Sequence, residues 1–345
     1  GTTSYGDILK AIREAMEGKH FQEFKDIDYL PEKLGKRVLT TGGHFGYLKI
    51  AEGCDKHCTY CIIPKLRGKF RSVPMERLVT QAKEMAEEGV KELILVAQET
   101  TVYGTDIYGK KSLHILLKEL CKIKGIRWIR VLYCYPEEIY DELIQTMKEE
   151  KKICHYLDLP IQHASDRILK RMGRRTTQAE LVEIVNKLRR EIPDIVLRTT
   201  LISGFPGETQ EDHEELMSFV DEMEFDRLGV FTYSPEEDTP AATMPDQVAE
   251  EVKEARRDEI MELQQEISYD KGTDRIGQEL LVMIEGKVAD ESAYIGRTYG
   301  DAPKVDGYIF VQTGELLMTG DFAKVRVTGA LEYDLIGELA DEYTE

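Results

Sequence analysis

Hydrophobic and polar positions alternate with two periods along the middle of the chain, and these periods predict strands and helices in turn. The apolar run "ELILVAQ" (92–98) is typical of a buried strand, whereas "SLHILLKELCKI" (112–123) has the three- and four-residue apolar spacing of a helix. The predicted strands are 47–53, 92–98, 128–133, 156–161, 195–202 and 227–233. The predicted helices are 74–88, 112–123, 137–149, 166–171, 177–190, 210–223 and a long charged helix at 245–269.

Six strand–helix units within about 200 residues predict a parallel sheet, because parallel neighbours need crossover connections. Six units are too few for a closed eight-stranded barrel, so we predict an α/β fold with a partial (β/α)6 barrel. Shorter alternating runs after residue 272 predict about five strands in a small antiparallel β-barrel. We therefore expect an N-terminal helix and linker (1–43), a main domain (44–271) and a small β-barrel domain (272–345).

Composition narrows the class of protein. The 345 residues are 41% hydrophobic, and no apolar run approaches the roughly 20 residues of a membrane span. Six cysteines are too few for a disulfide scaffold, and Cys121, Cys134 and Cys154 lie in apolar settings typical of buried residues. We expect a cytoplasmic protein. The net charge of −19 argues against a protein that coats nucleic acid, and it favours a basic partner or simply a soluble surface.

The stretch "AEGCDKHCTYCIIP" (51–64) brings Cys54, Cys58 and Cys61 together in a CxxxCxxC spacing. A structural zinc site would need a fourth ligand, for which His57 and His44 are the nearest candidates. An electron-transfer [4Fe–4S] cluster would also need four cysteines. Three thiolates leave one iron open, and an open iron can chelate a substrate through amino and carboxylate groups. We expect the backbone of this loop to have few partners besides the metal.

The spacing, with Tyr60 before the last cysteine, resembles the pattern of the radical S-adenosylmethionine (SAM) superfamily. The resemblance implies that Cys54, Cys58 and Cys61 are the metal-binding and catalytic cysteines of a [4Fe–4S] cluster with one open iron. In that superfamily the reduced cluster passes one electron to SAM, which gives methionine and a 5′-deoxyadenosyl radical.

The same resemblance implies positions around SAM. Gln98 and Glu99 of "AQET" take the place of the segment that holds the methionine amino group, and Tyr60 is expected near the adenine. Gly204 belongs to a glycine motif at the end of the fifth strand, where it would let the backbone approach the adenosyl group.

A second group of candidates follows the fourth strand or lies on the fifth. Gln162 is expected to face the cavity, and Arg174, Arg175 and Arg198 could balance the carboxylate of SAM. Surface charge is an equal alternative for these arginines. For His163, a satisfied structural histidine is the preferred interpretation.

Longer motifs resemble the methylthiotransferases of this superfamily, which insert sulfur at an unactivated C–H bond and add a methyl group. These motifs are "IAEGCDKHCTYCIIPKLRGKFRSVP" (50–74) and "GFPGET" (204–209), and the small β-barrel resembles their TRAM domain. The MiaB type acts on a tRNA adenosine, whereas the RimO type acts on the β-carbon of an aspartate in a small-subunit ribosomal protein. "YLDLPIQHASDRILKRM" (156–172) and "GRTYGDAPKVDGYIFV" (296–311) resemble the RimO type.

Charge supports that branch. Residues 273–345 hold fifteen Asp and Glu against six Lys and Arg, a net charge of −9. An RNA-reading domain should be basic, whereas an acidic one would attract a basic ribosomal protein. We therefore expect that protein and an external electron donor as partners, and no direct binding of nucleic acid. The tRNA branch is the alternative, and a zinc-stabilised binding module without catalysis is a third hypothesis.

The chain departs from the family pattern at its N-terminal side. The resemblance implies a preceding domain with three more cysteines that hold a second [4Fe–4S] cluster, but no cysteine precedes Cys54. We therefore expect a fragment that lacks this domain. Such a fragment would bind one cluster and cleave SAM without completing sulfur insertion.

Overall fold

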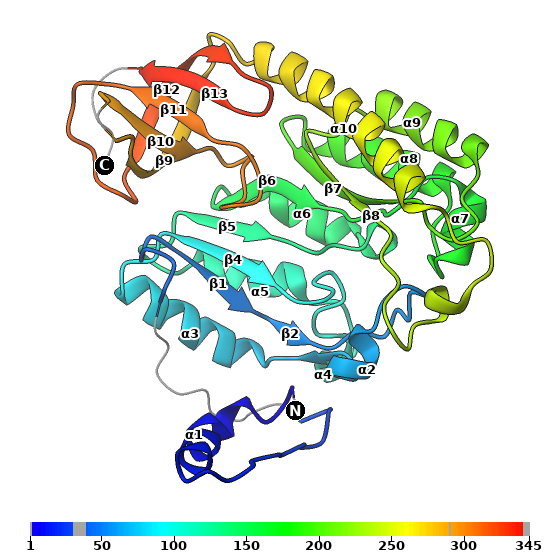
Figure 1. Ribbon diagram of the computed structural model, residues 1–345. Helices are drawn as coiled ribbons and strands as arrows, with labels where there is room; N and C mark the ends of the chain where they lie inside the picture. Colours follow the sequence, from blue (N-terminus) through cyan, green and yellow to red (C-terminus); the bar gives the residue numbers. More distant parts are fainter. Residues whose placement is uncertain (1, 30–38, 290, 341–345) are drawn as a thin grey trace.

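The computed structural model describes residues 2–29, 39–289 and 291–340 (Figure 1). The N-terminal segment holds a short 3-10 turn (Tyr5–Asp7) and helix α1 (Ile8–Met16). Most of the linker predicted before residue 44 lies outside the described residues. None of the helices in the described part of the chain is both long and apolar enough to cross a membrane.

An open sheet of six parallel strands forms the main domain, in the order β1-β4-β5-β6-β7-β8. Its strands are β1 (Phe45–Lys49), β4 (Glu92–Val96), β5 (Trp128–Val131), β6 (Ile153–Asp158), β7 (Val196–Ser203) and β8 (Arg227–Thr232). The predicted strand 47–53 is broken after Lys49, because Ala51–Glu52 (β2) turns away to pair with Arg71–Ser72 (β3). The predicted partial (β/α)6 barrel is confirmed.

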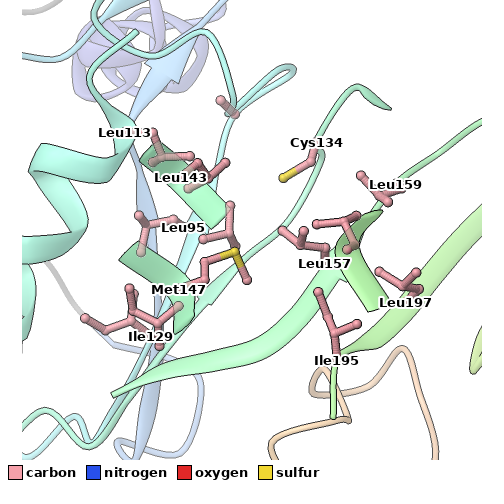
Figure 2. Packing of buried hydrophobic residues seen from close by; sticks show 14 of the residues in the cluster. Leu95, Leu113, Ile129, Cys134, Leu143, Met147, Leu157, Leu159, Ile195 and Leu197 are labelled. Atoms are coloured by element: carbon pink, nitrogen blue, oxygen red, sulfur yellow. The ribbon is translucent and has the colours of Figure 1, made fainter. Parts of the chain in front are cut away.

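Helices cover the outer face of this sheet (Figure 1). They are α3 (Met75–Glu87), α5 (Leu113–Cys121), α6 (Asp141–Glu149), α7 (Asp166–Arg171), α8 (Gln178–Glu191), α9 (Gln210–Met223) and α10 (Glu250–Thr273). The short helices α2 (Ile63–Arg67) and α4 (Thr105–Tyr108) have no buried residue and are not part of this cover. Alternate strand residues such as Leu95, Ile129 and Leu157 pack against helix residues such as Leu143 and Met147 (Figure 2). The helix predicted from residue 137 begins at Asp141, because Pro136–Glu138 form a 3-10 turn.

The C-terminal region is a closed barrel in the order β10-β11-β13-β12-β9. Its strands are β9 (Glu279–Lys287), β10 (Ala293–Arg297), β11 (Ile309–Gln312), β12 (Phe322–Ala330) and β13 (Leu335–Leu339). The five-stranded barrel is confirmed, but β11 and β13 pair in parallel. A closed ring of five strands cannot alternate in direction throughout, so one neighbouring pair must be parallel, and the other four pairs are antiparallel.

The two parts pack together at the amino end of the sheet. The first residues of several strands, including Phe45, Trp128 and Val196, share an apolar cluster with Met283 and Phe322 of the C-terminal barrel. The rings of Trp128 and Phe322 meet edge to face, with centroids 4.8 Å apart. The inner face of the sheet is thus covered at this end, and a ligand must enter from the other.

Charged side chains are buried in the same contact, which we call the amino-end interface (Glu92, Arg130, Arg297, Glu285 and His44). Glu92 accepts hydrogen bonds from Arg130 Nε at 2.8 Å and from Arg297 Nη2 at 2.7 Å. Arg297 Nε also donates to Glu285 Oε1 at 2.6 Å. Glu92, Arg130 and Arg297 have 0% exposure, so each charge depends on its partners for compensation.

The segment "GRTYGDAPKVDGYIFV" (296–311) contributes directly to this contact. Asp301 accepts from Arg227 Nη2 at 2.6 Å, and Asp306 accepts from the Tyr156 hydroxyl at 2.7 Å. Arg198 Nε lies 3.3 Å from Asp306. Much of the motif that resembles the RimO type therefore fastens the C-terminal barrel to the main domain.

Candidate active site

The chemistry-bearing motifs lie together at the carboxyl end of the sheet, opposite the C-terminal barrel (Figure 1). The Cys54–Cys61 loop follows β2, and Gln98 and Glu99 follow β4. Gln162 comes after β6, and Gly204 is the first residue after β7. Parallel strands bring these loops to one edge although they are far apart in sequence, which is where open α/β sheets bind ligands.

The Cys54–Cys61 loop has many backbone partners. Cys54 N–H donates to Gly68 O at 3.2 Å, Thr59 N–H to Met172 O at 2.9 Å, and Cys61 N–H to Cys58 O at 3.1 Å. Ala241 N–H donates in turn to Thr59 O at 2.9 Å. The expectation that this backbone would have few partners is wrong, because residues after α7 and β8 fold over the loop.

Gly53 sets the direction in which the loop leaves β2. Its φ is +80°, and a Cβ there would lie 2.1 Å from Lys69 O, so only glycine fits. Gly53 N–H donates to Gln98 Oε1 at 2.8 Å. Gln98, predicted to bind SAM, therefore holds the first residue before Cys54 in place.

The three cysteines form a cluster of buried or half-buried thiols. Burial raises the pKa of Cys54 to about 11, and the nearby Cys58 and Cys61 act in the same direction. Burial also raises the pKa of Cys61, with a smaller contribution from Cys58. The Cys54 and Cys61 thiols would thus remain protonated at neutral pH until a metal displaces the protons.

A site for a single metal ion is not formed. Among the described residues, no three His, Cys, Asp or Glu side chains converge as the ligands of one ion would. His44, a candidate zinc ligand, lies at the amino-end interface with Nε2 2.8 Å from Glu285 Oε2. His57 is exposed. A four-iron cluster holds its cysteine sulfurs farther apart than one ion does, so neighbouring but unconverged thiols suit the larger group.

Unpartnered polar groups surround these thiols and give an independent test of what fits. Within the described residues, Glu99 Oε2 and both Nε and Nη1 of Arg174 are buried without a hydrogen-bond partner. A cavity of about 190 Å³ is lined by Cys54, Lys56, Glu99 and Arg175, among others. A carboxylate oxygen and guanidinium donors beside three thiols suit a ligand that carries both an ammonium group and negative charge. The residues present therefore fit an iron–sulfur cluster with an amino acid-like ligand.

Glu99 is the buried acid of this group. Its Oε1 accepts from Thr101 N–H at 3.0 Å and from the Thr101 hydroxyl. Burial raises the pKa of Glu99 to about 7, although the bonds from Thr101 oppose this. A cation placed beside the free Oε2 would remove the cost of ionising it.

The predicted arginines differ in their surroundings. Arg174 is buried: its Nη2 donates to Pro160 O at 3.0 Å, and surface charge is the wrong interpretation for it. Arg175 is exposed at the rim of the cavity. Arg198 Nη1 donates to Asp158 at 2.9 Å, and its Nε lies 3.3 Å from Asp306. Its guanidinium is therefore paired with two carboxylates, one of them from the segment that packs on the amino end of the sheet. A SAM contact for these residues stays a prediction.

The remaining candidates lie near the site in different roles. The Tyr60 ring packs edge to face on Phe205, with centroids 6.3 Å apart. Gly204 has a φ of +69°, and a Cβ there would meet Lys253 Cγ at 2.2 Å. Gln162 is half-buried at a bridge to Leu201 with a φ of +73°.

His163 is buried, as a structural histidine would be, but only one of its ring nitrogens is satisfied: among the described residues Nε2 has no hydrogen-bond partner, and it lies 3.5 Å from Glu208 Oε2. Its Nδ1 accepts from Ser165 N–H at 3.0 Å, which fixes the ring beside the loop after β6.

Sequence reasoning missed Tyr135 and Lys56. The Tyr135 hydroxyl lies 3.6 Å from Cys58 Sγ, and the Lys56 and Arg174 cations lie 4.9 Å and 4.3 Å from the centre of its ring. A signal was present, because "LYCYP" (132–136) directly follows the third strand. The carboxyl end of that strand should carry a site residue like its neighbours.

Comparison with known proteins gives consistent matches. The model of the Radical SAM superfamily matches residues 48–220, and that of the TRAM domain matches residues 276–340. Both ranges lie inside the expected domains, whose boundaries stay a prediction. A ribosomal protein uS12 methylthiotransferase RimO from Lachnoclostridium phytofermentans is 64% identical over 337 residues, covering 98% of this chain and 77% of that protein.

Further relatives carry the same name. The protein from Clostridium perfringens is 53% identical over 344 residues, and the match covers 99% of this chain and 76% of the length of that protein. That from Clostridioides difficile is 48% identical over 342 residues, covering 99% and 77%. Among solved structures, the radical SAM enzyme coproporphyrinogen III oxidase from Escherichia coli covers 82% of this chain and 66% of its own, with a TM-score of 0.49 and 17% identity.

Proposed function

Because the chain belongs to the RimO family of methylthiotransferases within the radical SAM superfamily, we propose that its carboxyl-end site cleaves SAM and acts on an aspartate of ribosomal protein uS12, as the first stage of methylthiolation. Members of this superfamily use a [4Fe–4S] cluster and SAM. The observation that carries the proposal is the 64% identity to an enzyme of that name, which extends over 98% of this chain. The unpartnered groups around the cysteines are the local support.

The cysteines have the first role in this proposal. Cys54, Cys58 and Cys61 hold the cluster, which when bound supplies the electron that cleaves SAM, and an external donor reduces it. Gly53 and Gln98 fix the start of the loop through the 2.8 Å bond between them. The hydrogen bonds that the loop donates to Gly68 O and Met172 O, and the one that it accepts from Ala241 N–H, hold its backbone in shape before any metal binds. Little further ordering of the backbone is therefore needed when the cluster binds.

The polar groups have the second role. Glu99 Oε2 would accept from the ammonium group of SAM, and Arg174 would balance negative charge through Nε and Nη1, because these atoms are buried without partners among the described residues. Tyr60 and Gly204 lie on the side of the site formed by the turn after β7, where the adenosyl group is accommodated. Burial makes these contacts stronger than they would be in water, and it shields a reactive radical from side reactions.

The aspartate substrate reaches the site from the open carboxyl end, since the C-terminal barrel covers the amino end. The negative charge of that barrel favours a basic partner, as expected from the sequence. However, Asp301 and Asp306 are turned inward and paired with Arg227 and Arg198. Charge therefore supports the choice of substrate less strongly than family membership does.

The test is a deuterium-transfer experiment. The chain is loaded anaerobically with iron and sulfide, reduced with dithionite, and given SAM with a uS12 peptide whose substrate aspartate is deuterated at its β-carbon. The proposal predicts deuterium in the 5′-deoxyadenosine that forms. Transfer from a labelled tRNA adenosine, and none from the peptide, would establish the MiaB-type activity instead. Fully loaded protein that forms no 5′-deoxyadenosine would refute both.

A further inference from the structure

Tyr135 lies between two cations and next to a cysteine, in a group that we call the Tyr135 stack (Lys56, Tyr135 and Arg174). Lys56 Nζ is 4.9 Å and Arg174 Cζ is 4.3 Å from the centre of the phenol ring. The Tyr135 hydroxyl oxygen is 3.6 Å from Cys58 Sγ, within hydrogen-bond range of sulfur. Both cations are at cation–π distance from the ring.

Each cation is held in place by a separate contact. Lys56 forms an ion pair with Glu138 and lies 3.6 Å from Glu137. Arg174 has a side chain that is 1% exposed, and it is anchored by the bond from Nη2 to Pro160 O. Its Nε and Nη1 have no partner among the described residues. The stack is therefore a fixed arrangement in which the Arg174 guanidinium interacts with Cys58. Both cations are also near carboxylates, Lys56 near Glu137 and Glu138 and Arg174 4.0 Å from Glu137.

The direction of the hydrogen bond follows from the chemistry of the thiol. A metal binds the thiolate, which has no proton, so only the Tyr135 hydroxyl can donate once Cys58 is a ligand. A cation against the ring draws electron density from the phenol and makes its O–H a better donor. Hydrogen bonds to ligand sulfurs and nearby positive charge favour the more negative, reduced form of an iron–sulfur cluster.

We propose that Tyr135 is a positioning residue that donates a hydrogen bond to the Cys58 thiolate and, with Lys56 and Arg174, raises the reduction potential of the cluster. The inference rests on the proposed cluster site and goes beyond it, because the cysteine motif assigns no role to Tyr135, Lys56 or Arg174. In functional terms, the stack makes the cluster easier to reduce by an external donor.

The experiment compares Tyr135→Phe with Tyr140→Phe in the full chain, loaded with iron and sulfide. Tyr135→Phe keeps the ring and both cations but removes the hydroxyl. Tyr140 is a matched control: its hydroxyl bonds to His114 Nδ1 at 3.0 Å, and Lys111 lies 5.4 Å from its ring. The readouts are iron content and the midpoint potential, followed by the electron paramagnetic resonance signal of the reduced cluster.

The inference predicts a more negative midpoint potential for Tyr135→Phe. The equilibrium constant for reduction should fall roughly tenfold, which is about 59 mV for a one-electron couple. Tyr140→Phe should match the wild type. Full iron content with an unchanged potential in Tyr135→Phe would overturn the role of the tyrosine while leaving the proposed function intact. A wild-type chain that takes up no iron would refute the cluster site itself.

A second measurement covers the case in which Tyr135→Phe does not hold iron. The Fe–S stretching frequencies of the loaded wild type are compared by resonance Raman spectroscopy in H2O and D2O, beside loaded Tyr140→Phe. The inference requires a deuterium shift in both proteins, to which the backbone N–H groups of Lys56 and Ile63 at Cys54 and Cys61 also contribute. No shift in the wild type would overturn the inference without recourse to the variant.

Discussion

Two sets of buried charged groups lie at opposite ends of the same six-stranded sheet. At the amino-end interface, Glu92 is bonded to both Arg130 and Arg297 at 2.8 and 2.7 Å. At the carboxyl end, Glu99 Oε2 and two N–H groups of Arg174 are buried without partners in the described structure. The first set joins the main domain to the C-terminal barrel. The second set is complementary to a charged ligand that the chain itself does not supply.

The comparison shows how pairing separates a structural charge from a binding charge. Burying a charge without compensation is costly, so a fold keeps such groups only where another contact repays the cost. At the amino-end interface both oxygens of the Glu92 carboxylate are paired from within the chain, across 205 positions between Glu92 and Arg297, although in the described part of the chain Arg130 Nη2 and His44 Nδ1 also have no hydrogen-bond partner there. At the carboxyl-end site we propose that it comes from the cluster and SAM. The following predictions test this difference, from the largest effect to the smallest.

Glu92→Ala should give the largest effect. It leaves Arg130 and Arg297 buried without their shared carboxylate, and breaking a buried charge network in this way costs about 3–5 kcal/mol. We expect a corresponding fall in the free energy of unfolding, measured by urea titration at pH 7. A loss below about 1 kcal/mol would mean that the network does not fasten the two parts together.

Glu99→Gln should act in the opposite direction. Burial raises the pKa of Glu99 from 4.5 to about 7, so the folded state keeps a proton that the unfolded state releases. Its contribution to stability is present below pH 4.5 and is lost as the pH rises through 7. At pH 8 the iron-free variant should therefore be more stable than the wild type, by up to about 3 kcal/mol.

The pH dependence is the control for this prediction. Near pH 4.5 the advantage of Glu99→Gln in urea unfolding should shrink to a small fraction of its value at pH 8, because the folded state is then protonated and the unfolded state is about half protonated. A variant that is no more stable than the wild type at pH 8 would show that Glu99 is not an uncompensated charge.

Glu279→Ala should give the smallest effect. Glu279 is bonded to Arg326 at 3.0 Å between β9 and β12, and the two side chains are 47% and 44% exposed. Exposed ion pairs contribute about 0–1 kcal/mol, because water already solvates both charges. Urea unfolding should therefore barely distinguish this variant from the wild type. If Glu279→Ala lowered the free energy of unfolding as much as Glu92→Ala does, burial would not explain the difference between the two ion pairs.

Much of the fold was predictable because the main strands are continuous apolar runs. "ELILVAQ" became β4, and the (β/α)6 order followed from the alternation of strand and helix. The parallel pairing of β11 with β13 could not be predicted, since it depends on contacts between residues distant in sequence. The same is true of the amino-end interface, where a motif that resembled a family signature proved to carry Arg297, Asp301 and Asp306.

The site was predictable where residue type and spacing combine. The cysteine loop, Glu99 and Arg174 lie together, as the motifs indicated. Arg198 lies on the expected strand, but its charge is engaged with Asp158 and Asp306, which only the packing reveals. Tyr135 was missed because an aromatic residue between a strand and a proline looks like part of the core. Its position beside Cys58 depends on how two loops meet.

The most direct test of the central claim measures bound iron and 5′-deoxyadenosine from SAM in three proteins: the wild type, Cys58→Ala and Cys134→Ala. Cys134 is a matched control, since it is fully buried after β5 and its sulfur lies 3.3 Å from the Thr100 hydroxyl. The account predicts that Cys58→Ala loses the cluster and SAM cleavage, whereas Cys134→Ala keeps both. Equal iron and equal 5′-deoxyadenosine in the wild type and Cys58→Ala would contradict it.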